Sequence, residues 1–139
     1  MSLLGLELPR VRSAAAWSLQ SLLAASFLYF GATKYAGGEA ITASFEEIGV
    51  GQWLRYATGT TEILGGLALL YLPLSGLAAA ALTAQMVGAA VTQVAFVDDG
   101  SPVLPIVLGA LTLTLAWLHR DRSIETLHNL RIQLRPAAR

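Results

Sequence analysis

The chain has 139 residues, of which 55% are hydrophobic and 13% charged, with a net charge of zero and a mean hydropathy of +0.59. This composition lies outside the usual range of soluble domains and predicts one compact membrane protein. The absence of cysteine excludes thiolate catalysis, disulfide exchange and iron–sulfur ligation by this chain.

Four windows have the length needed to cross a hydrocarbon core about 30 Å thick, which takes about 17–25 mostly apolar residues. They lie near residues 13–34, 54–72, 75–97 and 102–119. All four are predicted to be helices, because none alternates like a strand and a helix satisfies its own backbone hydrogen bonds in lipid. The predicted fold class is therefore all-α, a transmembrane four-helix bundle.

The longest connection is residues 39–53, which follow the helix stop Gly37-Gly38. Within it, Ser44-Phe45-Glu46-Glu47 fits a capping box, so a short outer-side helix is predicted to start at Ser44 and to end at Gly49 or Gly51. This helix could lie as a lid across the outer mouth of the bundle.

The other two connections are tight. Residues 72–76 predict a cytoplasmic hairpin, and residues 98–102 predict an outer turn with Ser101 as N-cap and Pro102 at the first helical position. Connections this short force neighbouring spans to run antiparallel. Residues 1–120 are therefore expected to form a four-span bundle with up-down-up-down topology.

The distribution of positive charge predicts the orientation in the membrane. An even number of spans puts both termini on one side, which collects the arginines at positions 10, 12, 120, 122, 131, 135 and 139. The other side holds Lys34 and Arg55 among acidic residues. The positive-inside rule then places both termini in the cytoplasm of a multi-pass protein of the cell (inner or plasma) membrane.

Residues 121–139 form a cytoplasmic tail with two possible structures. Ile124, Leu127, Leu130 and Leu134 would share one side of a helix, and the arginines suggest that such an amphipathic helix lies on an anionic leaflet. A partly ordered solubilising tail is the alternative.

Small residues recur at intervals of four along the third span, at Gly76, Ala80, Ala84, Gly88 and Thr92. Such a ridge lets another helix approach closely in lipid. Internal packing is the favoured interpretation. The alternative is a homodimer, or contact with a redox partner subunit, through Gly76, Ala80, Ala84 and Gly88.

Glu62 is the most informative single residue, because it lies inside an apolar segment. A carboxylate at that depth costs about 2.5–3.5 kcal/mol on insertion scales. In a structural interpretation Glu62 pairs with Lys34 or hydrogen-bonds Gln85 and so fixes helix register. In a functional interpretation it lines a pocket and binds or protonates a small lipophilic molecule. Both interpretations stay open.

Lys34 is predicted to reach Glu62. Helical side chains lean toward their own N-terminus, so these two lean toward a shared depth from helices that run in opposite directions. Nearby glycines, including Gly59 and Gly65, are expected to leave open volume. The candidate ligand-binding residues are Glu62, Lys34, Gln85, Thr58, Gly66, Thr92 and Gln93.

Other kinds of site find little support. His119 and His128 are nine residues apart with no third ligand near them, so no metal site is expected. There is no phosphate loop, dinucleotide fingerprint or zinc-protease pattern. No covalently bound cofactor is implied, and membrane lipid rather than nucleic acid is the expected environment.

Three motifs, in order, resemble the DoxX-like family: Gly31-Ala32-Thr33-Lys34, Gly59-Thr60-Thr61-Glu62-Ile63-Leu64-Gly65-Gly66 and Met86-Val87-Gly88-Ala89. The resemblance covers roughly Ser13 to Leu118. It implies a four-helix membrane bundle with Lys34 and Glu62 at its characteristic charged positions. The wider group includes a small subunit of a thiosulfate:quinone oxidoreductase, a methylamine-utilisation membrane protein and receptor-assembly chaperones. Thr92-Gln93 stands where some relatives have a histidine, which disfavours a proton relay.

The first functional hypothesis is a redox-associated membrane subunit that binds a quinone, or a similar lipophilic molecule, near Glu62. The alternative is a non-catalytic membrane assembly or interaction protein. A small-molecule transporter is third, because four short spans leave little room for alternating access. Whether the protein is an enzyme stays open.

Overall fold

The computed structural model describes residues 4–134, and over these residues it contains only helices and their connections. The all-α class is confirmed. The helices are α1 (Leu4–Ala36), α2 (Glu39–Ile48), α3 (Trp53–Leu70), α4 (Leu72–Phe96), α5 (Val103–Leu118) and α6 (Arg120–Gln133). The four long helices α1, α3, α4 and α5 cover the four apolar windows of the sequence, and α1 begins nine residues before the predicted start at Ser13.

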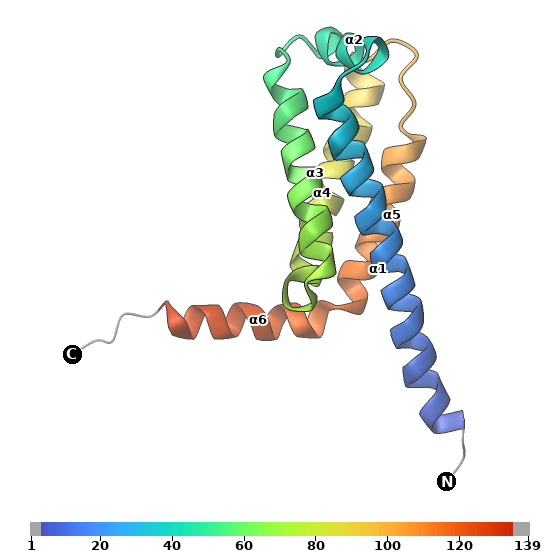
Figure 1. The fold of residues 1–139 in the computed structure, drawn as a ribbon, viewed down its shortest axis with the longest axis vertical. Helices are drawn as coiled ribbons and strands as arrows, with labels where there is room; N and C mark the ends of the chain where they lie inside the picture. The colour runs from blue at the N-terminus through green and yellow to red at the C-terminus, as the bar shows by residue number, and fades with distance from the viewer. Residues whose placement is uncertain (1–3, 135–139) are drawn as a thin grey trace, which may run out of the picture.

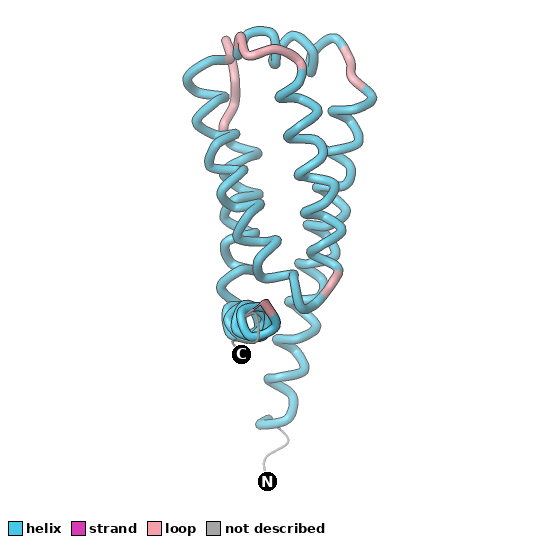
Figure 2. Tube along the Cα trace, turned by 90° about the vertical axis from the view of Figure 1, so that its left-hand side faces the viewer, coloured by secondary structure: helices cyan, strands magenta, loops and turns pink. Residues whose placement is uncertain are grey.

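The four long helices lie side by side, with α2 across one end and α6 projecting sideways at the other (Figures 1 and 2). The contacts between neighbouring helices run in opposite chain directions. Along α1 and α3, for example, Lys34 meets Glu62 whereas Gln20 meets Leu69. The most extensive contacts join α1 to α3 and α4 to α5.

Among the described residues, α4 is the one helix that is itself long and apolar enough to cross a membrane. The helix α5 meets this criterion only together with Ser123–Gln133, from which it is separated by a 67° bend. The outward surface is nevertheless apolar on every long helix. Leu22 on α1, Leu64 on α3, Val91 on α4 and Leu113 on α5 are all more than half exposed. Large apolar surfaces of this kind mark membrane or protein contacts.

The start of α2 differs from the prediction. The helix begins at Glu39, with Gly38 as its N-cap at a φ of 142°, and Ser44 lies in its middle. The Ser44 hydroxyl donates a hydrogen bond to the Ala40 carbonyl at 2.9 Å, so the predicted capping box is wrong. A glycine in this conformation reverses the chain without a side-chain cap. The predicted end is confirmed, because Gly49 adopts a left-handed φ of 79°.

Both tight connections are shifted from their predicted positions. Tyr71 alone separates α3 from α4, so residues 72–76 form the first turn of α4 and not a hairpin loop. Pro73 fits there because the first turn of a helix needs no N–H donors from that residue. The helix α5 starts one residue later than predicted, with Pro102 and not Ser101 as its N-cap, so the predicted cap is wrong. The Ser101 hydroxyl accepts a 3.5 Å hydrogen bond from the Val103 amide.

The small-residue ridge of α4 divides into two parts. Gly76 is buried against His119 of the α5–α6 junction, which agrees with internal packing. Ala80, Ala84 and Gly88 are exposed, so internal packing does not account for them, and Gly88 also lines the cavity described below. Their role as a seam for a partner stays a prediction.

The tail is helical as far as Gln133, and residues 135–139 lie outside the described part of the chain. The Thr126 hydroxyl donates a 3.0 Å hydrogen bond to the Pro73 carbonyl, which holds α6 against the start of α4. The predicted apolar side of α6 is solvent-exposed, at Ile124, Leu127, Leu130 and Leu134.

Candidate functional site

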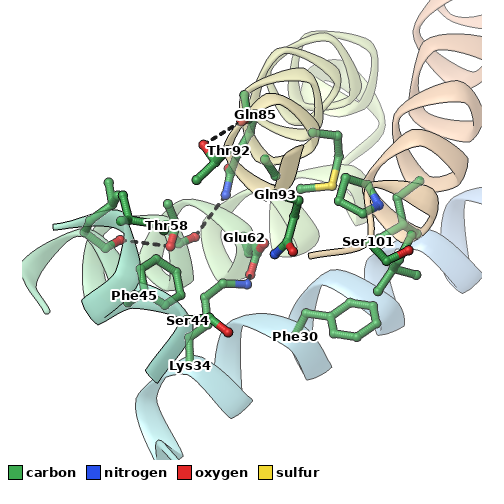
Figure 3. Close-up of a pocket in the computed structure, with 18 residues that line it drawn as sticks. Phe30, Lys34, Ser44, Phe45, Thr58, Glu62, Gln85, Thr92, Gln93 and Ser101 are labelled. Carbon is green, nitrogen blue, oxygen red and sulfur yellow. Dashed lines mark hydrogen bonds and ion pairs between the residues drawn. The ribbon is translucent and has the colours of Figure 1, made fainter. Parts of the chain in front are cut away.

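Lys34 and Glu62 form an ion pair, which confirms the predicted contact. The Lys34 Nζ atom lies 2.6 Å from Glu62 Oε2, and the two side chains are 20% and 5% exposed. Lys34 comes from the last turn of α1 and Glu62 from the middle of α3. Because the two helices are antiparallel, both side chains lean to the same level, as Figure 3 shows.

A buried arginine holds the end of α1 that carries Lys34. Arg55 is 7% exposed, and its Nη1 donates to the Lys34 carbonyl, one of the last four carbonyls of α1. Its Nε donates to Gln52 Oε1 at 2.7 Å, and its Nη2 donates to the Tyr56 hydroxyl at 2.8 Å. A cation at a helix C-terminus complements the helix dipole. The sequence analysis counted Arg55 only among the charges that predict the orientation in the membrane, and it missed this role.

A cavity of about 480 Å³ opens beside the ion pair (Figure 3). It is bounded by all four long helices and by α2. Six of the seven candidate residues line it: Lys34, Thr58, Glu62, Gln85, Thr92 and Gln93. The structure thus brings together, in one cavity, residues from three helices that are far apart in the sequence.

Gly66 is the candidate residue that the cavity does not include. A Cβ atom at Gly66 would lie 3.1 Å from the Ala24 carbonyl, so this glycine permits close packing of α3 on α1. An added Cβ at Gly59 would lie 3.2 Å from the Gly31 carbonyl, so the expectation of open volume is also wrong there. Gly65 packs against Leu82 on one side, and it lines a separate hollow between α3 and α4 rather than this cavity. The open volume lies instead at Gly88 of α4, where an added Cβ would meet nothing within 4 Å.

Some polar side chains of the cavity already form hydrogen bonds within the protein, and others do not. The Thr61 hydroxyl donates to Gln85 Oε1 at 2.8 Å, and Gln85 Nε2 donates to the Thr58 carbonyl at 3.2 Å. The Thr92 hydroxyl donates to the Gly88 carbonyl at 2.8 Å. The side chain of Gln93 makes no hydrogen bond within residues 4–134, so its amide is available to a ligand.

Apolar side chains make up most of the wall. They are Phe30, Phe45, Ile48, Leu54, Met86, Leu104, Pro105 and Leu108. Phe45 and Ile48 were expected as part of the lid, but the other six were not singled out, because apolar residues at helical spacing do not reveal which of them face a cavity. Phe45 and Ile48 belong to α2, so this helix does cover one end of the cavity, as expected. A 3.0 Å hydrogen bond from the Asp98 amide to Glu47 Oε2 links α2 to the α4–α5 connection.

The two histidines lie away from this cavity. His119 is buried beside Ser75, with 2.7 Å between its Nδ1 and the serine Oγ, at the opposite end of α4. His128 is exposed on α6. No group of three metal-ligating side chains is found in the part of the chain that the structure describes. The lining of the cavity, mostly apolar with a few polar groups, suits a mainly apolar molecule that carries a few hydrogen-bonding groups.

Comparisons with curated proteins and with solved structures give no match. A model of the DoxX-like family matches residues 18–115, more than half of the chain. The matched segment contains the Lys34–Glu62 pair and every residue that lines the cavity. By this match the chain belongs to the DoxX-like family of membrane proteins.

Proposed function

We propose that this DoxX-like protein binds a small lipophilic molecule, such as a quinone, in the cavity beside Lys34 and Glu62, as the membrane subunit of a redox system. The observation that carries the proposal is a charged pair set in the mostly apolar wall of a cavity of about 480 Å³. Sites for small molecules typically have about 300–1,000 Å³ and a few placed polar groups.

The proposal places α1, α3, α4 and α5 across a cell membrane, with both termini in the cytoplasm. The apolar outer surfaces of the four helices support this arrangement. The arginines near the start of α1 and those of α6 belong to one end of the molecule, whereas the acidic residues of α2 and the α4–α5 connection belong to the other (Figure 1). This asymmetry follows the positive-inside rule.

The ion pair supports a ligand that changes between carbonyl and hydroxyl forms. A quinone oxygen accepts hydrogen bonds, which the Lys34 ammonium donates. A quinol hydroxyl donates hydrogen bonds, which the Glu62 carboxylate accepts. The free amide of Gln93 offers both a donor and an acceptor at the same cavity. One set of side chains can therefore hold both redox forms of the same ring.

The test is equilibrium binding of a short-chain quinone to the purified protein in lipid nanodiscs. Gly88→Leu should fill the cavity and weaken binding at least tenfold. Ala84→Leu is the matched control, because Ala84 is an exposed residue one turn away on α4 and does not line the cavity. Equal affinity of the two variants would refute the proposed site, and so would unchanged affinity in Glu62→Gln.

A non-catalytic assembly role is the second candidate, favoured by the exposed small residues Ala80 and Ala84 on α4. Because the chain has no cysteine, Ala84→Cys introduces a single reactive thiol. Oxidation in native membranes joins two such thiols across a dimer seam, and a thiol-to-amine crosslinker joins the thiol to a lysine of a partner subunit. One of the two treatments should give one discrete product. A protein that stays monomeric under these conditions would contradict the assembly role.

A further inference from the structure

A second hollow lies between α3 and α4. It has about 350 Å³ and is lined by small or apolar residues together with two threonines and a glutamine: Ala57, Thr58, Thr61, Gly65, Ala81, Leu82 and Gln85. Thr61 and Ala81 are exposed, so this hollow is a groove on the outer surface of the helix pair. Thr58 and Gln85 line the groove and also line the cavity beside Glu62. These two residues therefore form the partition between the groove and the cavity.

The movable part of this partition is the side chain of Gln85. The Thr58 hydroxyl is held by its own helix, where it donates to the Leu54 and Arg55 carbonyls. Gln85 instead reaches from α4 to α3 and is held by hydrogen bonds with the Thr61 hydroxyl and the Thr58 carbonyl. A change of rotamer breaks both bonds at once and leaves no other bond of this side chain to restrain it.

We propose that the α3–α4 groove is a lateral portal that holds the hydrocarbon tail of the ligand, with Gln85 as its gate. This inference rests on the proposed function. A cavity of about 480 Å³ holds a ring with a short substituent but not a long isoprenoid tail, so the tail must leave between two helices. The groove adjoins the cavity, and Gly65 and Ala81 present no large side chain to an extended chain. Its outer side faces the surrounding lipid in the proposed topology.

The test compares two quinones that share one ring, one without a tail and one with a long isoprenoid tail, by their dissociation constants in nanodiscs. Ala81→Trp should fill the groove, weaken binding of the long-tailed quinone about tenfold and leave the tailless quinone unaffected. The control is Ala80→Trp, because Ala80 is exposed but lines neither the groove nor the cavity. This control should leave the affinity of both quinones unchanged.

Gln85→Ala removes the gate without filling the groove. In stopped-flow measurements it should raise the association rate of the long-tailed quinone several-fold relative to that of the tailless quinone. If the tailless quinone binds the unsubstituted protein but Ala81→Trp affects neither quinone, the portal is refuted and the proposed function stands. That result would place the exit elsewhere, such as between α1 and α5. If neither quinone binds the unsubstituted protein, both the proposed function and the portal are refuted.

Discussion

The two ends of the four long helices use their polar residues in different ways. At the end away from α2, Ser75 and His119 are buried and hydrogen-bonded to each other. The core leucines Leu69 and Leu115 are completely buried. At the end covered by α2, the Lys34–Glu62 pair borders open volume. The same helices thus build a closed end for stability and an open end that can receive a ligand.

The helices α1 and α3 show the same contrast, because a side chain of each donates a hydrogen bond to a carbonyl near the C-terminal end of the other. Arg55 of α3 donates to the Lys34 carbonyl near the end of α1, and Gln20 of α1 donates to the Leu69 carbonyl near the end of α3. Arg55 makes two further hydrogen bonds, whereas the Oε1 atom of Gln20 has no partner within residues 4–134. Within this helix pair, the open end is therefore held by a charged donor, and the closed end by packing and one neutral side-chain hydrogen bond.

Breaking the ion pair should give the largest effect on stability. Glu62→Ala leaves Lys34 without its partner, and removing one member of a buried pair typically costs about 3–5 kcal/mol. Thermal unfolding in a mild detergent measures the loss. Adding Lys34→Ala should restore part of it, because the double variant no longer contains an unpaired charge.

The exposed contact between Arg120 and Asp121 provides a control for this measurement. Its atoms are 3.8 Å apart and the Asp121 side chain is 86% exposed, so Asp121→Ala should leave the unfolding temperature unchanged. If the stability losses of Lys34→Ala and Glu62→Ala add up in the double variant, the two side chains have no interaction energy with each other.

Arg55→Leu should have the next largest effect. It removes the hydrogen bonds to the Lys34 carbonyl, Gln52 and Tyr56, and hydrogen bonds from a charged donor contribute about 1.5–3 kcal/mol. Ligand affinity should also fall, because the end of α1 that positions Lys34 loses its cap. If Arg55→Leu lowers stability but leaves ligand affinity unchanged, the hydrogen bonds of Arg55 do not contribute to the position of Lys34 in the site.

Gln20→Leu tests the corresponding cap at the closed end and should cost less, about 0.5–1.5 kcal/mol. The substitution removes one neutral hydrogen bond, and it also removes a buried oxygen that has no partner in the described chain. Denaturant titration of both variants checks the order. A larger loss for Gln20→Leu than for Arg55→Leu would reverse the comparison.

The smallest effect is expected for Gly88→Ala, which should raise stability by about 0.4–1 kcal/mol because it lowers the entropy of the unfolded chain. The added methyl group meets nothing within 4 Å. The same change at Gly31 should lower stability by about 1–3 kcal/mol, since its Cβ would lie 2.8 Å from the Gly59 carbonyl. Equal effects at the two glycines in thermal unfolding would contradict the placement of the cavity.

These features differ in how far the sequence could predict them. The long helices follow from apolar windows, and the Lys34–Glu62 contact follows from antiparallel neighbours and the lean of helical side chains. The start of α2 could not be predicted from the capping-box pattern at Ser44, because the chain already turns at Gly38 and the helix begins at the next residue. The expectation of open volume beside the glycines near Glu62 was wrong, because a glycine in a sequence is compatible both with close helix packing and with open space. Only the structure shows that Gly66 is packed against α1 whereas Gly88 borders open space.

The connection at Tyr71 has a consequence for the biogenesis of this protein. In the proposed topology α3 must carry Glu62 into the bilayer, at an insertion cost of about 2.5–3.5 kcal/mol. The next helix, α4, is the one that by itself meets the length and hydropathy criterion for a membrane span among the described residues. Because Tyr71 alone joins them, α3 and α4 turn back on each other as a tight helical hairpin. In this topology the two helices would enter the bilayer as one hairpin, and the apolar surface of α4 would offset the cost of the Glu62 carboxylate.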